Sequence, residues 1–273
     1  MKSVYSRSPL YVFSSFWTYR GLIGQLVRRD VEMRYRGSVM GLLWSLFNPI
    51  LMLAVYTFAF GFMLKSRWSE GSGSHGEFAI ILFAGLIIQG WFAECFNRAP
   101  SLILGNVNYV KKVIFPLEIL PWVAMGSALF HTLISLLVLI ISFACIHLYV
   151  HWTIIFLPMV LFPFLLLVMG LLWMLAAVGV YLRDVGQTVV IVSMILLFIS
   201  PVFYPLNNIP ASFRWAFYLN PVTFIVEQTR AIVIWGKMPL WNYLALYYLV
   251  SMVIAWSGLM VFQKLRGGFA DVI

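Results

Sequence analysis

The chain has 273 residues, of which 63% are hydrophobic and only 10% are charged, and its mean hydropathy is +0.95. Soluble domains carry about 25% charged residues, so this composition excludes a soluble globular protein and indicates an integral membrane protein. The net charge of +9 is therefore interpreted through the placement of basic residues around a membrane, and no nucleic-acid partner is expected.

The apolar runs are as long as helical membrane spans, which favours an all-α bundle over a barrel of ten-residue alternating strands. We predict a single membrane domain over residues 1–273. Its first element is residues 19–36, where Ile23, Val27 and Val31 share one i, i+4 row and basic residues occupy much of the other side. This pattern predicts an amphipathic helix lying in the membrane interface.

Six transmembrane helices follow in chain order. The predicted spans are residues 39–64, 78–96, 123–147, 154–182, 185–203 and 240–262. Asn48-Pro49 interrupts the first span, and the proline is expected to kink it because it removes one backbone hydrogen bond. The third and fourth spans are separated only by a tight turn around His151-Trp152.

A long polar segment, residues 97–121, interrupts the apolar middle of the chain. It carries Arg98, Lys111, Lys112 and Glu118, whereas the 64 residues from 119 to 182 contain no Asp, Glu, Lys or Arg. Each Lys or Arg at the centre of a membrane helix costs about 2.5–3.5 kcal/mol, so the segment should emerge into water. Asn97 and Pro100 can begin a short helix there, which the break at residues 105–108 would end. An ordinary basic loop is the alternative.

The stretch 204–239 is divided by four prolines. Its two apolar pieces, 212–219 and 222–235, are too short to cross a membrane, and segments of that length are typically re-entrant or interfacial. We predict two short re-entrant helices before the last span, with Glu227 and Arg230 paired on the second. A single irregular extracytoplasmic loop is the alternative.

The distribution of basic residues predicts the orientation. With both termini on one side, thirteen of the eighteen Lys and Arg residues lie on that side and five on the other. Cytoplasmic loops carry the excess of Lys and Arg. We therefore expect both termini and residues 97–121 to be cytoplasmic, in a multi-pass membrane protein.

Catalytic motifs are missing from the sequence. It contains no GxxxxGK[ST] phosphate loop, no HExxH, no GxSxG and no cluster of Cys and His. Asp and Glu are nearly absent from the spans, although an ion-coupled transporter normally needs ionisable groups there. His131, inside the third span, is expected to make a hydrogen bond within the bundle. We therefore expect no cofactor, no metal and no enzymatic activity in this chain. If the chain moves a substrate uphill, the energy must come from a partner, and the helix in residues 97–121 is the expected contact.

Several motifs together resemble the transmembrane subunit of type-2 ABC exporters of polysaccharides, the Wzm-like O-antigen permeases and the related teichoic-acid permeases. In chain order the carrying residues are Arg29-Asp30, Arg34-Tyr35-Arg36-Gly37-Ser38, Gly41 and Trp44 leading to Asn48-Pro49, Asn106 through Lys111-Lys112-Val113 to Phe115-Pro116 and Pro121, Tyr181-Leu182-Arg183-Asp184-Val185, Ser200-Pro201-Val202-Phe203-Tyr204-Pro205, Asn220-Pro221, and Phe269-Ala270-Asp271. They extend over nearly the whole chain. One departure is Glu32, at a position where a basic residue is expected.

The resemblance implies a homodimer around a central pathway, with two separate ABC ATPase subunits that hold ATP and Mg²⁺. Residues 97–121 would then contain the coupling helix that seats in an ATPase cleft. Its coupling residues are expected to be Asn106, Asn108, Lys111, Lys112, Phe115 and Glu118. The substrate implied is a long glycan on an undecaprenyl-diphosphate-type lipid, exported from the cytoplasm.

Two groups of side chains are the candidates for contact with this substrate. We expect four guanidinium groups to attract the diphosphate, because their forked donors match phosphate oxygens; they belong to Arg28, Arg29, Arg34 and Arg36. Aromatic faces stack on sugars but also serve lipid-facing packing. The predicted glycan pathway consists of Trp44, Asn48, Tyr56, Phe60, Trp91, Phe92 and Phe96.

Other functions stay open at this point. The terminal Phe269-Ala270-Asp271 and the Asn-Pro in the first span favour O-antigen export and a Gram-negative inner membrane, with capsule, teichoic-acid, or drug or lipid ABC-2 permeases as alternatives in the same class. A membrane-embedded glycolipid-modifying enzyme would need catalytic carboxylates and histidines that the spans lack. A passive channel or scaffold would have no use for the 97–121 helix.

Overall fold

The computed structural model describes residues 11–59, 75–110 and 115–273, and all regular structure within these ranges is helical. Within these ranges, five helices are long and apolar enough to cross a membrane. They are Gly41–Ala59, Glu77–Ser101, Leu117–His147, Trp152–Tyr181 and Trp241–Val272. The predicted all-α class is thus confirmed, with candidate spans at five of the six predicted positions.

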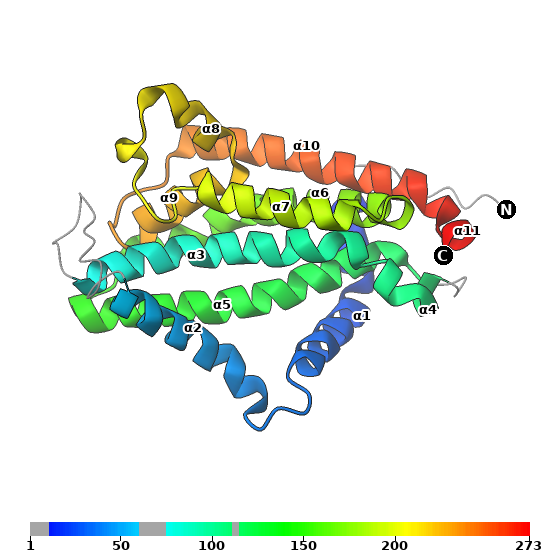
Figure 1. Cartoon of the computed structure of the whole chain (residues 1–273), viewed down its shortest axis with the longest axis horizontal. Helices are drawn as coiled ribbons and strands as arrows, with labels where there is room; N and C mark the ends of the chain where they lie inside the picture. Colours follow the sequence, from blue (N-terminus) through cyan, green and yellow to red (C-terminus); the bar gives the residue numbers. More distant parts are fainter. Residues whose placement is uncertain (1–10, 60–74, 111–114) are drawn as a thin grey trace.

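The long helices form one elongated bundle, from which the first two helices diverge. The longer elements are α1 (Tyr11–Arg34), α2 (Trp44–Tyr56), α3 (His75–Arg98), α5 (Leu120–His147), α6 (Leu157–Tyr181), α7 (Val185–Phe198) and α10 (Trp241–Leu265). The shorter α-helices are α4 (Val107–Val110), α8 (Arg214–Leu219), α9 (Pro221–Val233) and α11 (Phe269–Val272). Figure 1 shows α3, α5, α6, α7 and α10 running along the bundle, with α1 and α2 joined in a V beside it.

The first helix is longer than predicted. It begins at Tyr11 rather than at residue 19, but Tyr19 has non-helical dihedral angles (φ −105°, ψ 15°), so the predicted start coincides with a kink. The first span begins with a 3₁₀ turn, Gly41–Leu43, and α2 then continues through Pro49. The last predicted residues of this span, 60–64, lie outside the described residues.

The fifth predicted span, 185–203, is shorter than expected. Helix α7 has 14 residues and ends at Phe198, which corresponds to a length of about 21 Å. The hydrocarbon core of a bilayer is about 30 Å thick. The helix stops because Pro201 offers no N–H and disfavours a helical conformation at Ser200. Unbroken apolar composition alone had suggested a helix through residue 203.

The two predicted helices before the last span are present, as α8 and α9. Helix α9 begins with Pro221 in its first turn, and the Asn220 side chain caps it by accepting a hydrogen bond from the Val222 N–H at 3.0 Å. The second predicted helix, 222–235, ends slightly earlier, at Val233. The backbone near its end turns at Gly236, which has a positive φ of 61°.

The predicted Glu227–Arg230 ion pair is confirmed, with a separation of 3.0 Å. Arg230 is completely buried. Its guanidinium also donates to the carbonyl oxygens of Ile81 at 2.9 Å, Pro201 at 2.5 Å and Val202 at 2.9 Å. One side chain therefore fastens α9 to α3 and to the turn that follows α7.

Glycines allow the closest helix contacts in the bundle. A Cβ added at Gly258 of α10 would lie 2.0 Å from the carbonyl oxygen of Gly170 in α6, and one at Gly170 would lie 2.4 Å from the carbonyl oxygen of Ile254. Likewise, a Cβ at Gly179 would lie 2.3 Å from the carbonyl oxygen of Pro100. In membranes, small residues let helix backbones approach and gain van der Waals contact. Helix α6 is thus the central element of the bundle.

We expect Gly258→Ala to destabilise the protein by about 1–3 kcal/mol, because the added methyl group overpacks a backbone contact. Thermal unfolding of the purified protein in a mild detergent measures the effect. Gly186→Ala in α7 is the matched control, since no atom lies within 4 Å of the position of its new methyl group. Equal midpoints for the two variants would contradict the proposed backbone contact.

Candidate functional site

Two ion pairs hold α1 against the end of α3. The Arg98 guanidinium donates to both oxygens of Asp30, at 2.7 and 2.5 Å, and the Ser127 hydroxyl donates to the same carboxylate at 2.6 Å. Four residues further along α1, Arg34 pairs with Glu94, which lies four residues earlier in α3. Because residues four apart share one face of a helix, the two pairs form an antiparallel ladder.

The Asp30 carboxylate is the charge on which this ladder depends. Partial burial tends to raise its pKa, but the hydrogen bonds from Arg98 and Ser127 outweigh burial, so the pKa of Asp30 lies below its ordinary value. The folded protein therefore favours the ionised carboxylate. Since Asp30 and Arg98 come from elements 68 positions apart, the sequence did not reveal this pair.

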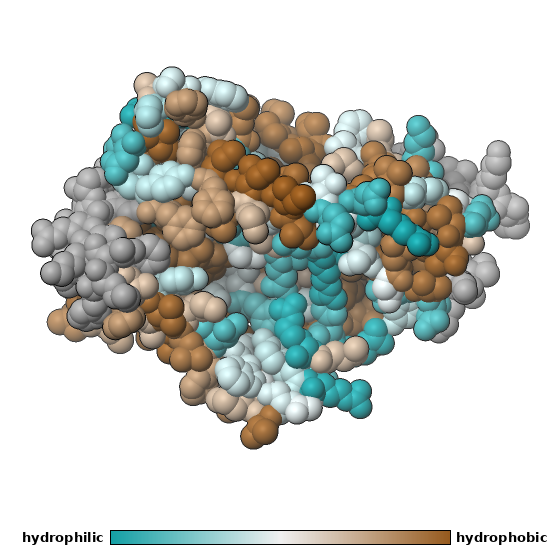
Figure 2. Space-filling view, in the orientation of Figure 1, coloured by the Kyte–Doolittle hydropathy of each residue, from teal (hydrophilic) through white to brown (hydrophobic). Residues whose placement is uncertain are grey.

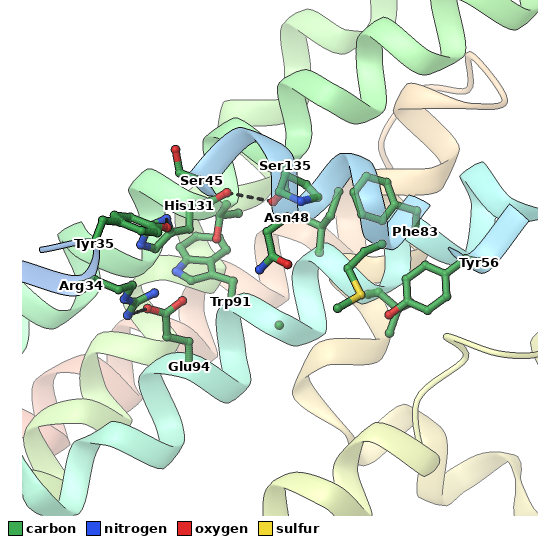
Figure 3. Close-up of a pocket in the computed structure, with 16 residues that line it drawn as sticks. Arg34, Tyr35, Ser45, Asn48, Tyr56, Phe83, Trp91, Glu94, His131 and Ser135 are labelled. Carbon is green, nitrogen blue, oxygen red and sulfur yellow. Dashed lines mark hydrogen bonds and ion pairs between the residues drawn. The ribbon is translucent and has the colours of Figure 1, made fainter. Parts of the chain in front are cut away.

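A cavity of about 370 Å³ lies between the end of α1 and helices α2, α3 and α5. Its polar lining residues are Arg34, Tyr35, Ser45, Asn48, Tyr56, Glu94, His131, Thr132 and Ser135, and the others include Pro49, Met52, Phe83, Ile87 and Trp91. Figure 3 shows the Arg34–Glu94 pair, Tyr35 and His131 at one end and Tyr56 and Phe83 at the other. The charged side chains of the lining are thus confined to one end of the cavity.

Two buried nitrogen atoms in the cavity lining have no hydrogen-bond partner among the described residues: Nε2 of His131 and Nε1 of Trp91. The other ring nitrogen of His131 lies 3.3 Å from the Tyr35 hydroxyl. Buried polar atoms are nearly always satisfied. Hydroxyl-rich or phosphate-bearing ligands would supply the missing partners. Figure 2 shows hydrophilic side chains gathered in this part of the surface, beside the hydrophobic surfaces of the helices.

The four predicted diphosphate-binding arginines have different surroundings. Only Arg34 lines the cavity. Arg28 is highly exposed and pairs with Glu32 at 2.7 Å, so the unexpected Glu32 neutralises one of the four charges locally. Arg29 donates to the Tyr109 hydroxyl at 2.8 Å, and Arg36 is exposed.

The predicted pathway residues also differ in where they lie. Asn48, Tyr56 and Trp91 line the cavity. Phe92 and Phe96 stack on each other with centroids 4.9 Å apart, and Phe92 is buried in the core. Trp44 is half-exposed and is not among the lining residues, and Phe60 lies outside the described residues.

Several polar lining residues were not among the predicted pathway residues: Tyr35, Ser45, His131, Thr132 and Ser135. A signal for three of them was present in the sequence, because polar residues at 131, 132 and 135 recur at helical spacing in an otherwise apolar span. Only His131 was noted, as a residue expected to form a hydrogen bond within the bundle. Its contact with the Tyr35 hydroxyl is consistent with that expectation.

The polar segment after α3 forms short helical turns rather than one helix. These are Ala99–Ser101, Leu104–Asn106 and α4, and they lie at the end of the bundle that also carries α11 (Figure 1). The predicted cap at Asn97 is wrong, because α3 continues to Arg98; Pro100 instead falls in the following 3₁₀ turn. A helical segment between the two spans is confirmed.

The predicted coupling residues differ in exposure. Asn108 is exposed, whereas the Asn106 amide is half-buried and donates to the Leu102 carbonyl oxygen at 2.9 Å. Phe115 stacks on Tyr109, with ring centroids 4.2 Å apart. Lys111 and Lys112 lie outside the described residues.

Glu118 is buried and pairs with Arg266, which also donates to the carbonyl oxygen of Phe115 at 3.2 Å. The segment is thus attached to α1 through the Arg29–Tyr109 hydrogen bond and to the end of α10 through Arg266. Contacts of the six predicted coupling residues with a partner stay a prediction.

The sequence profile of a family described as ABC-2 type transporter matches residues 21–234, well over half of the chain. The chain belongs to the ABC-2 type transporter family. Its matched region includes both ion pairs of the ladder and the whole cavity.

Individual relatives extend the match to almost the full length. The chain is 28% identical over 259 residues to an O-antigen export system permease protein, RfbA, of Myxococcus xanthus, covering 94% of this chain and 97% of the relative. A protein of the same name from Klebsiella pneumoniae is 24% identical, with 92% and 95% covered. The polysialic acid transport protein KpsM of Escherichia coli is 28% identical, with 88% and 93% covered. This ABC-2 type chain therefore resembles polysaccharide permeases from end to end.

We expect Asp30→Asn to lower the stability at pH 7 by about 1–3 kcal/mol, because Arg98 and Ser127 lose a charged acceptor. A carboxylate with a lowered pKa contributes stability above its unfolded pKa, about 3.9, and loses that contribution as the pH falls through the folded pKa. The difference from the unmodified protein should thus shrink below about pH 4. Thermal unfolding at several pH values measures it, with the exposed Asp184→Asn as control. A difference independent of pH would contradict this role for Asp30.

Proposed function

We propose that this chain is the membrane-spanning permease of an ATP-driven exporter of lipid-linked polysaccharide, with O-antigen as the substrate. The observation that carries the proposal is the end-to-end similarity to proteins named as O-antigen export permeases. The polar and aromatic cavity supports it, since sugars require both hydrogen-bonding groups and stacking faces. The similarity to a polysialic acid transport protein favours another exported polysaccharide as the second candidate.

The energy would come from two ABC ATPase subunits that hold ATP and Mg²⁺. The polar turns with the exposed Asn108 project from the end of the bundle and suit the cleft of such a subunit. An ATPase that pushes on α4 would move Tyr109 and, through its hydrogen bond to Arg29, helix α1. Since Arg34 ends α1 and lines the cavity, this motion would reach the charged end of the cavity directly.

A homodimer would complete the pathway. Helices α2 and α7 are the least covered of the long membrane helices: the buried residues in α2 are Ser45 and Pro49, and those in α7 are Val189 and Ser193. Either lipid or protein can cover such apolar faces. A second copy that covers them would place two cavities beside one central channel, long enough for a polymer to slide through.

We further propose six spans and an inner-membrane location with cytoplasmic termini. Helix α7 would be the fifth span in chain order, made complete by the buried turn at Pro201 and Val202. Helices α8 and α9, with 6 and 13 residues, would dip into the outer leaflet without crossing it. The excess of basic residues on the side of the termini and α4 supports this orientation.

Arg34 is our primary candidate for recognising the lipid diphosphate, with the exposed Arg36 beside it. A carrier phosphate that enters the cavity would compete with Glu94 for the Arg34 guanidinium, which can present two parallel donors to phosphate. Arg28 and Arg29 would add a positive field, although Glu32 and Tyr109 already engage them. Recognition would therefore involve an exchange of partners at Arg34.

We expect the double variant Arg34→Gln/Glu94→Gln to reduce polysaccharide export at least tenfold, because the cavity lining then contains no arginine to receive the phosphate. Glu94→Gln alone should keep most of the export, since Arg34 retains its charge. Surface polysaccharide in cells that lack the unmodified protein is the measurement, with insertion and dimer content checked for each variant. Equal export by the two variants would show that Arg34 does not receive the phosphate.

Purification of the tagged chain from gently solubilised membranes tests the proposed function itself. We expect an ABC ATPase to copurify at one to one and to hydrolyse ATP. Asn108→Trp should lower its recovery at least fivefold by blocking the contact, whereas the exposed Asn208→Trp outside this segment should not. Consistent absence of an ATPase in several mild detergents would refute the exporter.

A further inference from the structure

An apolar groove of about 530 Å³ lies between the first half of α1 and the walls of α5 and α6. It shares no lining residue with the cavity described above. Trp122 and Leu129 of α5 and Phe162 of α6 form part of its wall, and Trp17, Arg20 and Gly24 belong to the α1 side. Its volume falls in the range of about 300–1,000 Å³ that is typical of small-molecule sites.

The groove lies between two close contacts of α1 with α5. At one, the rings of Phe16 and Trp122 lie 4.9 Å apart. At the other, Val27 packs so closely that a Cβ added at Gly126 would lie 2.6 Å from its side chain. Between them stands Gly24, where no atom lies within 4 Å of an added Cβ. Helix α1 thus arches over a space that its own side chains leave unfilled.

Arg20 is the charged residue in the lining of the groove. Its guanidinium donates to the Trp17 carbonyl oxygen at 2.9 Å and lies 5.4 Å from the centre of the Trp17 ring, which is 68% exposed. The hydrogen bond to Trp17 uses one of the five N–H donors of an arginine. The Arg20 guanidinium and the Trp17 indole therefore lie together beside the apolar groove. Tryptophan is enriched at the level of lipid headgroups.

We propose that this groove binds one anionic phospholipid per protomer. Its acyl chains would lie against α5 and α6, and its phosphate would bind Arg20. The walls of the groove belong to membrane spans, so the groove is surrounded by the hydrocarbon of the bilayer. An acyl chain can therefore fill it without removing water from any polar group. The single cation selects a headgroup of opposite charge. The lipid would lie at the depth of Trp122, two residues after the start of α5. In the orientation proposed above, this depth belongs to the cytoplasmic leaflet.

The bound lipid would act as a spacer that sets the height of α1 above α5. Because α1 also carries Arg29 and Arg34, it would set the position of the coupling contact and of the charged end of the cavity. The lipid would thus be a structural ligand of the exporter and not its cargo. Whether it binds is independent of the substrate that the exporter moves.

Native mass spectrometry of the purified full-length protein tests the site, with phosphatidylglycerol or phosphatidylcholine added after delipidation. Gly24→Leu fills the groove and should weaken the binding of the most tightly bound phosphatidylglycerol molecule at least tenfold. Gly21→Leu is the matched control, because it adds the same side chain to α1 at a position with open space that does not line the groove. Leu129→Trp fills the groove from α5 and replaces Gly24→Leu if that variant is not recovered.

Arg20→Gln tests the headgroup contact. It should lower the preference for phosphatidylglycerol over phosphatidylcholine at least fivefold, and Arg20→Lys should restore most of it. Equal lipid retention by the groove-filling variant and Gly21→Leu would show that the groove is not the lipid site. A preference for phosphatidylglycerol that is unchanged by Arg20→Gln would show that Arg20 does not bind the headgroup, and would overturn the assignment of an anionic lipid.

Discussion

The ion pair between Asp30 and Arg98 is the interaction on which the arrangement of the functional elements depends. It is partly buried, bidentate and supported by Ser127, so α1 is held in one register against α3 and α5. A shift along α3 by one turn would bring Asp30 towards Glu94, where two carboxylates would repel each other. The same register places Arg34 at the cavity and Arg29 at Tyr109.

Helix α1 therefore connects three parts of the molecule that are separate in the sequence. One part is the polar cavity beside α2, another is the polar segment at the end of α3, and the third is the apolar groove against α5 and α6. Arg266 attaches this polar segment to the last long helix as well. A force applied to α4 would thus be shared between α1 and α10, while the glycine contacts of α6 keep the centre of the bundle fixed.

Several features could be predicted because they depend on local chemistry. The low charge content predicted a helical membrane protein, and the charges of residues 97–121 predicted a break between two long helices, which the short turns between α3 and α5 confirm. The prolines of residues 204–239 predicted two short helices, and the spacing of Glu227 and Arg230 predicted their contact. The end of α7 at Phe198 was missed, because hydropathy does not register the backbone restriction imposed by Pro201.

The sequence by itself determined which segments are helical, which carry charge and which family the chain resembles, because these properties follow from residues close together along the chain. Only the tertiary structure decided which side chains meet. Phe92 and Phe96 are as aromatic as Tyr56 and Trp91, yet they stack on each other, whereas Tyr56 and Trp91 line the cavity. Likewise, Arg34 and Arg28 differ in their surroundings, because Glu94 comes from another helix and Glu32 from the same one. The direction of a side chain is set by helix rotation and packing, which depend on partners far away in the chain.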